Sequence, residues 1–146
     1  MTTIILTVIG ILLAAAAALM IIFYGGDAFN SGSVGAQANT LQNAGTNVLT
    51  ASQMFYADHR ADPANVAALT AADANGDGDA YLDSAPSLQG VSGITTADIN
   101  AAGTRYEVAG VSTEVCTKVN RNLGITGTPT GAEKMGCLSG TFYATL

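Results

Sequence analysis

The stretch from Ile4 to Tyr24 reads IILTVIGILLAAAAALMIIFY and contains no charged residue. At 1.5 Å per residue, a helix of this length spans the hydrocarbon core of a bilayer. A removable signal peptide would have a basic segment in front, a shorter apolar run and a small-residue cleavage site. Residues 1–3 carry no lysine or arginine, and the apolar run is too long for a signal peptide. The stretch therefore predicts a retained apolar helix.

The N-terminal flank and the alanines of this stretch favour more than a simple anchor. An ordinary transmembrane anchor has flanking charges that set its orientation, and none precedes Ile4. We therefore expect that a charged leader has been removed in front of Met1. The run from Ala14 to Ala18 would let helices approach one another closely, which suits helix-on-helix packing better than exposure to lipid.

The other residues predict one small, acidic domain. The chain has 146 residues, which is room for one domain, and its hydrophobic fraction of 49% is concentrated at the N-terminus. Five basic residues stand against eleven acidic ones. Phosphate binding needs clustered cations, so this pattern excludes a nucleic-acid role and electrostatic adhesion to anionic lipid. The basic residues are scattered: Arg60, Arg105, Lys118, Arg121 and Lys134.

A second helical segment follows Gly25-Gly26. Its apolar or small residues recur at spacings of three and four, which defines one face of an amphipathic helix. Glycines 25, 26, 32 and 35 each weaken a helix by up to about 1 kcal/mol, so we expect a kink or a locally melted stretch there. A firmer helix is expected from Val34 to Asp58. The predicted face consists of Phe29, Val34, Ala38, Leu41, Gly45, Val48, Ser52 and Phe55.

The remainder reads as an α+β head with a small antiparallel sheet. Asp62-Pro63 ends the helical region, because proline disfavours helix at the residue before it. The predicted organisation is a hydrophobic transmembrane or filament-core helix at 1–26, an amphipathic helix packing on the head at 27–58, and the globular head at 59–146. Within the head we predict a helical turn from Asn65 to Thr70, a strand from Thr104 to Val108, a helix from Val111 to Leu123 that Ser112 or Thr113 caps, a loop from Ile125 to Gly136, and a strand from Thr141 to Leu146.

The only two cysteines are Cys116 and Cys137. Two cysteines in a secreted head suggest one disulfide, whereas a cytosolic chain would keep them as thiols. A bridge between them closes a loop of roughly 20 residues and contributes about 3 kcal/mol in the chain-entropy account. For a small head this is a useful fraction of total stability.

An acidic loop in the head resembles the front of an EF-hand calcium loop. Oxygen ligands at positions one, three and five and a glycine at six match the pattern, but Ser84 stands where the bidentate Glu of position twelve belongs. The alternative is a solvated turn, because Asn-Gly and Asp-Gly are common turn dipeptides. Calcium binding and a plain acidic turn both stay open. The candidate ligands are Asp73, Asn75, Asp77, Asp79 and Asp83.

Catalytic patterns are missing from the sequence, so we expect no enzymatic activity. The chain has one histidine, His59, and no Ser/His/Asp, Cys/His or phosphate-cradling glycine motif. His59 lies at a polar helix end, where we expect a solvated cation favoured by the helix dipole. Phe55 and Tyr56 are expected to be core residues rather than a ligand platform.

These parts together resemble the type IV pilins, and most closely the type IVb subclass. The segment from Tyr106 to Val119 (YEVAGVSTEVCTKV) is similar to the strand and cysteine-bearing helix of that subclass, and Met1 to Tyr24 is similar to its N-terminal helix. The resemblance implies a bacterial structural subunit whose N-terminal helices pack into a surface filament, a pilus or fimbrium. It implies N-terminal processing and methylation at Met1, and core packing through Ile4, Ile5, Val8, Ile9, Leu12, Leu13, Leu19 and Ile22.

The resemblance also implies a location and partners. The chain would be anchored in the inner membrane before assembly and would then belong to the extracellular filament. Its partners would be other copies of itself, in a helical homopolymer, and the pilus assembly machinery. No cofactor is implied with certainty, and calcium is the one candidate.

Two positions depart from the family pattern. The family usually carries Glu at the fifth position, thought to pair with the neighbouring N-terminal amine, whereas this chain has Ile5. A buried unpaired amine is costly, so Thr2 or Thr3, N-methylation or a main-chain carbonyl would have to replace the glutamate, unless Met1 is not the processed terminus. The family's helix-breaking proline is also absent, and Gly25-Gly26 stands as the local candidate for its role.

Two other functions stay open. A pseudopilin of a type II-like secretion system would form only a short filament, although pseudopilins commonly favour bound calcium over a disulfide. A non-polymerising bitopic membrane protein would use its head to bind calcium or a partner protein. The pair Cys116 and Cys137 favours a true pilin over a pseudopilin.

Overall fold

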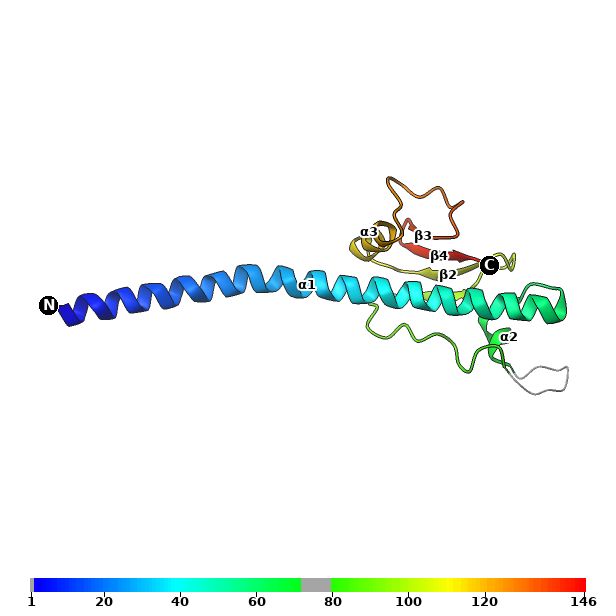
Figure 1. Ribbon diagram of the computed structural model, residues 1–146, viewed down its shortest axis with the longest axis horizontal. Coiled ribbons are helices and arrows are strands. Elements are labelled where there is room, and N and C mark those ends of the chain that lie inside the picture. Colours follow the sequence, from blue (N-terminus) through cyan, green and yellow to red (C-terminus); the bar gives the residue numbers. More distant parts are fainter. Residues whose placement is uncertain (1, 72–79) are drawn as a thin grey trace. The chain divides into compact units, whose positions relative to one another are not determined.

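A computed structural model describes the backbone of residues 2–71 and 80–146 (Figure 1). The chain divides into two compact units, Met1–Val34 and Gly35–Leu146. The first unit is helical throughout its described residues, and the second combines helices with one sheet. The α+β prediction is therefore confirmed.

The longest element is helix α1, Thr2–His59, which contributes to both units. It is helical through Gly25-Gly26, so the expected locally melted stretch is not found. Glycine lowers helix propensity but keeps its backbone donor and acceptor, and extending an existing helix costs far less than nucleating one. The helix ends where Arg60 adopts a left-handed φ of 53° and its N–H donates to the carbonyl of Tyr56 at 2.8 Å.

The second unit is built around a four-stranded antiparallel sheet with the order β1-β2-β4-β3. Two of its strands, β2 (Arg105–Ala109) and β4 (Thr141–Thr145), confirm the predicted strands. The edge strands β1 (Thr96–Ile99) and β3 (Met135–Leu138) were not predicted. Strand β1 exposes three of its four residues, and the two buried residues of β3 are adjacent, so neither strand shows an alternating pattern of burial. Strand β3 also begins inside the predicted Gly/Thr/Pro loop, so the C-terminal end of that loop prediction is wrong.

One face of the sheet packs against the second part of α1. On β2 and β4, Tyr106 pairs with Ala144 and Val108 with Phe142, and all four side chains are buried. A Cβ placed on Gly45 of α1 would lie 2.9 Å from Cζ of Phe142, so glycine permits the close approach there. Five residues of the predicted helix face are buried, which confirms that part of it: Ala38, Leu41, Gly45, Val48 and Ser52. The prediction is wrong for Phe29, which is 84% exposed, and Val34 and Phe55 are half-buried.

Two short helices complete the unit. Helix α2, Val66–Thr70, begins after Asn65, whose side chain accepts from the N–H of Ala68 at 2.8 Å. Helix α3, Thr113–Asn122, begins after Ser112, whose hydroxyl accepts from the N–H of Val115 at 3.4 Å. Both predicted helices are confirmed, with ends that differ by one or two residues.

Candidate functional site

The first candidate surface is the apolar part of α1, Ile4–Phe23. Its twenty residues have a mean hydropathy of 2.9, and none of them is buried. At 1.5 Å per residue the segment is about 30 Å long, the thickness of a bilayer's hydrocarbon core. The predicted packing residues are all between 48% and 70% exposed: Ile4, Ile5, Val8, Ile9, Leu12, Leu13, Leu19 and Ile22.

This exposure carries a large free-energy cost in water. Burying one large aliphatic side chain stabilises a protein by about 1.5–3 kcal/mol, and the segment exposes more than ten such side chains. Exposed apolar surface on this scale marks a site of contact with a membrane or with other protein chains. Ile5 adds to this apolar surface with 58% of its area exposed. Met1 lies outside the described residues.

The second feature is the joint between α3 and β3. Cys116 and Cys137 form the predicted disulfide. One turn beyond Cys116, the amide of Asn120 donates to the carbonyl of Cys137 at 2.9 Å and accepts from its N–H at 2.8 Å. The joint is therefore both covalent and hydrogen-bonded, and Asn120 occupies polar groups of an edge strand that could otherwise pair with another chain. Sequence reasoning missed Asn120, whose only signal was its four-residue spacing from Cys116.

The loop between α3 and β3 is held by Glu133. Its carboxylate accepts from the hydroxyl of Tyr143 at 2.8 Å, from the N–H of Gly131 at 2.9 Å and from the N–H of Thr130 at 3.2 Å. The bond from Tyr143, followed by backbone N–H donors, lowers the pKa of Glu133 to about 2. Arg105 lies 5.3 Å from the ring centre of Tyr143 and donates to the carbonyl of Gly131. The sequence did not predict this cluster.

An aromatic cluster lies at the C-terminal end of α1. The rings of Phe55 and His59 stack with centres 4.2 Å apart, and Tyr81 donates to Asp58 at 2.8 Å. His59 is half-buried, and its Nδ1 lies 3.2 Å from the carbonyl of Phe55. His59 lies in the last turn of α1 as expected, but its ring is half-buried rather than solvated, because it stacks on Phe55 one helical turn earlier.

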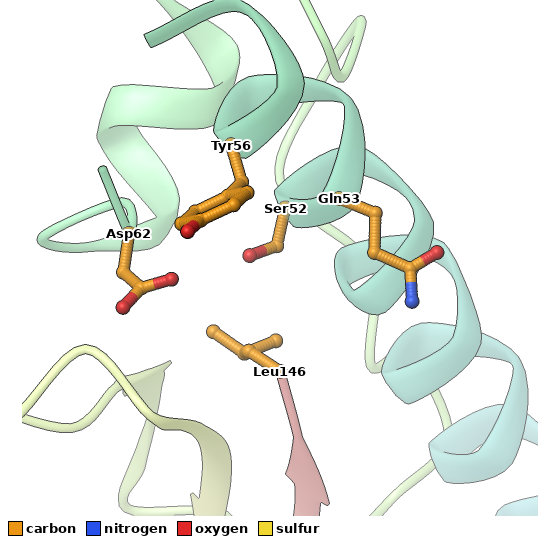
Figure 2. A pocket seen from close by; sticks show the side chains of 5 residues that line it. All are labelled: Ser52, Gln53, Tyr56, Asp62 and Leu146. Atoms are coloured by element: carbon orange, nitrogen blue, oxygen red, sulfur yellow. The ribbon is translucent and has the colours of Figure 1, made fainter. Parts of the chain in front are cut away.

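A cavity of about 400 Å³ opens beside the same part of α1 (Figure 2). Its walls are Ser52, Gln53 and Tyr56 from α1, Asp62 from the following turn, and Leu146 after strand β4. The side chains of Ser52, Tyr56, Asp62 and Leu146 point toward the same space (Figure 2). Tyr56 is 54% exposed, so the expectation that it belongs to the core is wrong.

The calcium prediction is not tested by the structure. Asp73, Asn75, Asp77 and Asp79 lie outside the described residues, and Asp83 is exposed. Among the side chains that the structure describes, no group of three or more His, Cys, Asp or Glu could hold a metal ion. The acidic turn and the calcium loop both stay open.

Comparison with family models, with curated proteins and with solved structures finds no match to this chain. Its function must therefore be inferred from its own surfaces. These are an apolar helical segment that can cross a membrane, a disulfide-bonded α+β unit, and a cavity in that unit.

Proposed function

We propose that this chain is a structural subunit that polymerises into a surface filament of the type IV pilus kind. The observation that carries the proposal is that no residue of Ile4–Phe23 is buried, on a helix that continues into a folded, disulfide-bonded unit. Such a segment needs a cover that its own unit does not supply. In the proposed filament, the same segments of neighbouring copies provide this cover.

The composition of the segment supports packing of helix against helix. Gly10 and the five alanines from Ala14 to Ala18 are small, and a Cβ on Gly10 would meet nothing within 4 Å. Small residues allow two helices to approach closely, and the large aliphatic residues on either side then interlock. Before assembly, a bilayer would cover the same twenty residues, since their length matches its hydrocarbon core.

The second unit has properties that suit the outside of a filament. The disulfide between Cys116 and Cys137 is typical of proteins that leave the reducing cytosol. Both edge strands of its sheet are only four residues long, and Asn120 covers part of β3. The sheet is therefore poorly suited to grow by strand addition, which leaves α1 as the element that would drive polymerisation.

A bitopic membrane protein is the second candidate. The length and hydropathy of Ile4–Phe23 would serve a single membrane crossing equally well. The two candidates differ in where the segment ends up. In a filament it leaves the bilayer and is covered by protein, and in a bitopic anchor lipid continues to cover it.

The test is electron microscopy of sheared surface material from cells that make the chain, with an antibody against residues 35–146. The expected result is labelled filaments, and their loss in a variant with Leu12→Lys, which places a charge in the exposed apolar segment. Labelled chain confined to the membrane fraction, with no filament in the wild type, would support the bitopic anchor and refute the filament.

A further inference from the structure

We propose that the cavity beside Tyr56 and Asp62 binds the Arg121 side chain of a second copy of this chain, so that successive heads join head to tail. This inference rests on the proposed filament and identifies a contact between its outer units. The receiving and the inserting surface both lie within the unit Gly35–Leu146.

The receiving surface combines apolar walls with one carboxylate. Asp62 is exposed, and among the described residues none donates a hydrogen bond to its carboxylate or forms an ion pair with it. Tyr56 is 54% exposed and lines the same cavity, and Leu146 closes it from the side of β4 (Figure 2). A guanidinium suits such a place, because it stacks on an aromatic ring, pairs with a carboxylate and has an apolar stem.

The inserting surface is the last turn of α3. Arg121 is exposed there, and no acidic side chain that the structure describes pairs with it. Lys118, one turn earlier, adds a second positive charge, and its Cε would lie 3.9 Å from a Cβ on Gly35. Asn122 contacts Asn39 across a distance of 3.5 Å between Nδ2 and Oδ1. These contacts place the basic end of α3 beside residues 35–39 of α1.

The two surfaces are too far apart to meet within one chain. Gly35 and Tyr56 are 21 residues apart on α1, which corresponds to about 32 Å at 1.5 Å per residue. No arginine side chain spans that distance. A contact between two different surfaces of identical subunits is heterologous, and it builds a filament when the rotation between subunits does not close a ring.

The distribution of charge favours a second copy over another partner. The described residues 58–71 and 80–83 contain three aspartates and one arginine, whereas residues 117–125 contain Lys118 and Arg121 and no acidic residue. The chain thus presents both members of a complementary pair at separate ends of one unit. Complementary charge of this kind chooses the partner and its orientation more than it adds affinity.

Cysteine cross-linking tests the contact in the full-length chain. The double variant Asp62→Cys, Arg121→Cys should give a ladder of dimers, trimers and higher multimers on non-reducing gels after mild oxidation of assembled material. Each single variant should give dimers at most, because neither can form the heterologous bond. Filaments seen by microscopy without a ladder would overturn this inference and leave the proposed function standing. A wild type that forms no filament would overturn both.

Charge exchange provides the second test. Arg121→Glu and Asp62→Arg should each lower the yield of sheared filament about tenfold, which corresponds to the loss of one well-placed charge pair. The double variant Asp62→Arg, Arg121→Glu, which combines the two changes, should restore most of the yield. Lys134→Glu is the matched control, because it makes the same change of charge on an exposed lysine outside both surfaces. If Arg121→Glu and Lys134→Glu lowered the filament yield equally, the effect would come from net charge, and the proposed contact would be refuted.

Discussion

Two parts of helix α1 have the same backbone but different surroundings. In the part Ile4–Phe23 none of the twenty residues is buried, although every face is apolar. In the part at residues 38–52 one face is buried and the asparagines at 39, 43 and 47 are exposed. A helix with one apolar face can bury that face against its own sheet, whereas a helix that is apolar on every face needs a membrane or other chains to cover it. The difference shows that the first part of α1, and not the second, lacks a cover within the chain.

The largest effect is expected where α1 meets its own sheet. Phe142→Ala removes the ring that lies against Gly45 and should lower the free energy of unfolding of the second unit by about 3–5 kcal/mol. Chemical denaturation of the full chain in detergent, followed by near-ultraviolet circular dichroism, measures this loss. Leu13→Ala is the control, because its side chain is 66% exposed, and it should leave that transition unchanged.

A charge in the exposed part of α1 should change where the chain is found in the cell but not the stability of the second unit. Leu12→Lys should disfavour burial of the segment in a bilayer by about 3 kcal/mol, since lysine is strongly rejected at the centre of a membrane helix. The chain should shift from the membrane fraction to the soluble or aggregated fraction. The thermal midpoint of the second unit should not change, and a fall in that midpoint would contradict the separation of the two parts.

Removal of the disulfide should weaken the sheet that covers residues 38–52. Replacing Cys116 and Cys137 by alanine opens a loop with a sequence separation of 21 residues and should cost about 3 kcal/mol. The two hydrogen bonds between Asn120 and Cys137 should keep α3 docked, so the variant should still fold. Adding Asn120→Ala to the double variant should lower the urea midpoint further. No further loss would show that Asn120 does not secure this joint.

Two glycines of α1 form a matched pair that tests the close packing. Gly45→Ala places a Cβ 2.9 Å from Phe142 and 3.1 Å from Met135, and should destabilise the second unit by about 1–3 kcal/mol. Gly35→Ala meets only Cε of Lys118 at 3.9 Å and should stabilise the helix by about 0.5–1 kcal/mol. Thermal unfolding of both variants measures whether the midpoint falls for Gly45→Ala and rises for Gly35→Ala. Equal changes in the midpoint would contradict the close approach at Gly45.

The smallest effect is expected for the contribution of Glu133 to stability at acidic pH. Because Glu133 has a folded pKa of about 2, below its ordinary value of 4.5, its contribution to stability is complete above the ordinary value and is lost as the pH falls toward 2. Glu133→Gln should therefore reduce the decline of the unfolding free energy between about pH 4.5 and pH 2. Denaturant titrations at several pH values measure the slope. Glu114→Gln, the same substitution at an exposed residue of α3, is the matched control, and Glu133→Gln should change the slope more than this control does.

Sequence patterns predicted the parts whose signal is local. The four-residue spacing of Val115 and Val119, the cap at Ser112 and the alternation around Tyr106 gave the helix and strand that the structure contains. The disulfide was predicted from the cysteine count and the apolar segment in front of it. Strands β1 and β3 were missed because short edge strands are defined by their neighbours and not by their own pattern.

The tertiary structure decided the remaining features. Three hydrogen-bonded pairs join residues that are ten to twenty-three positions apart in the sequence: Glu133 with Tyr143, Cys137 with Asn120, and Tyr81 with Asp58. No periodicity in the sequence signals such pairs. The cavity between Tyr56, Asp62 and Leu146 exists only because the end of β4 lies beside α1. By itself, the sequence determined that an uncharged twenty-residue helix must find cover, since hydrophobicity is a property of composition. The sequence also predicted that an amphipathic helix at 27–58 packs on the head, but only the packing of the sheet around Gly45 decided that its buried face extends from Ala38 to Ser52.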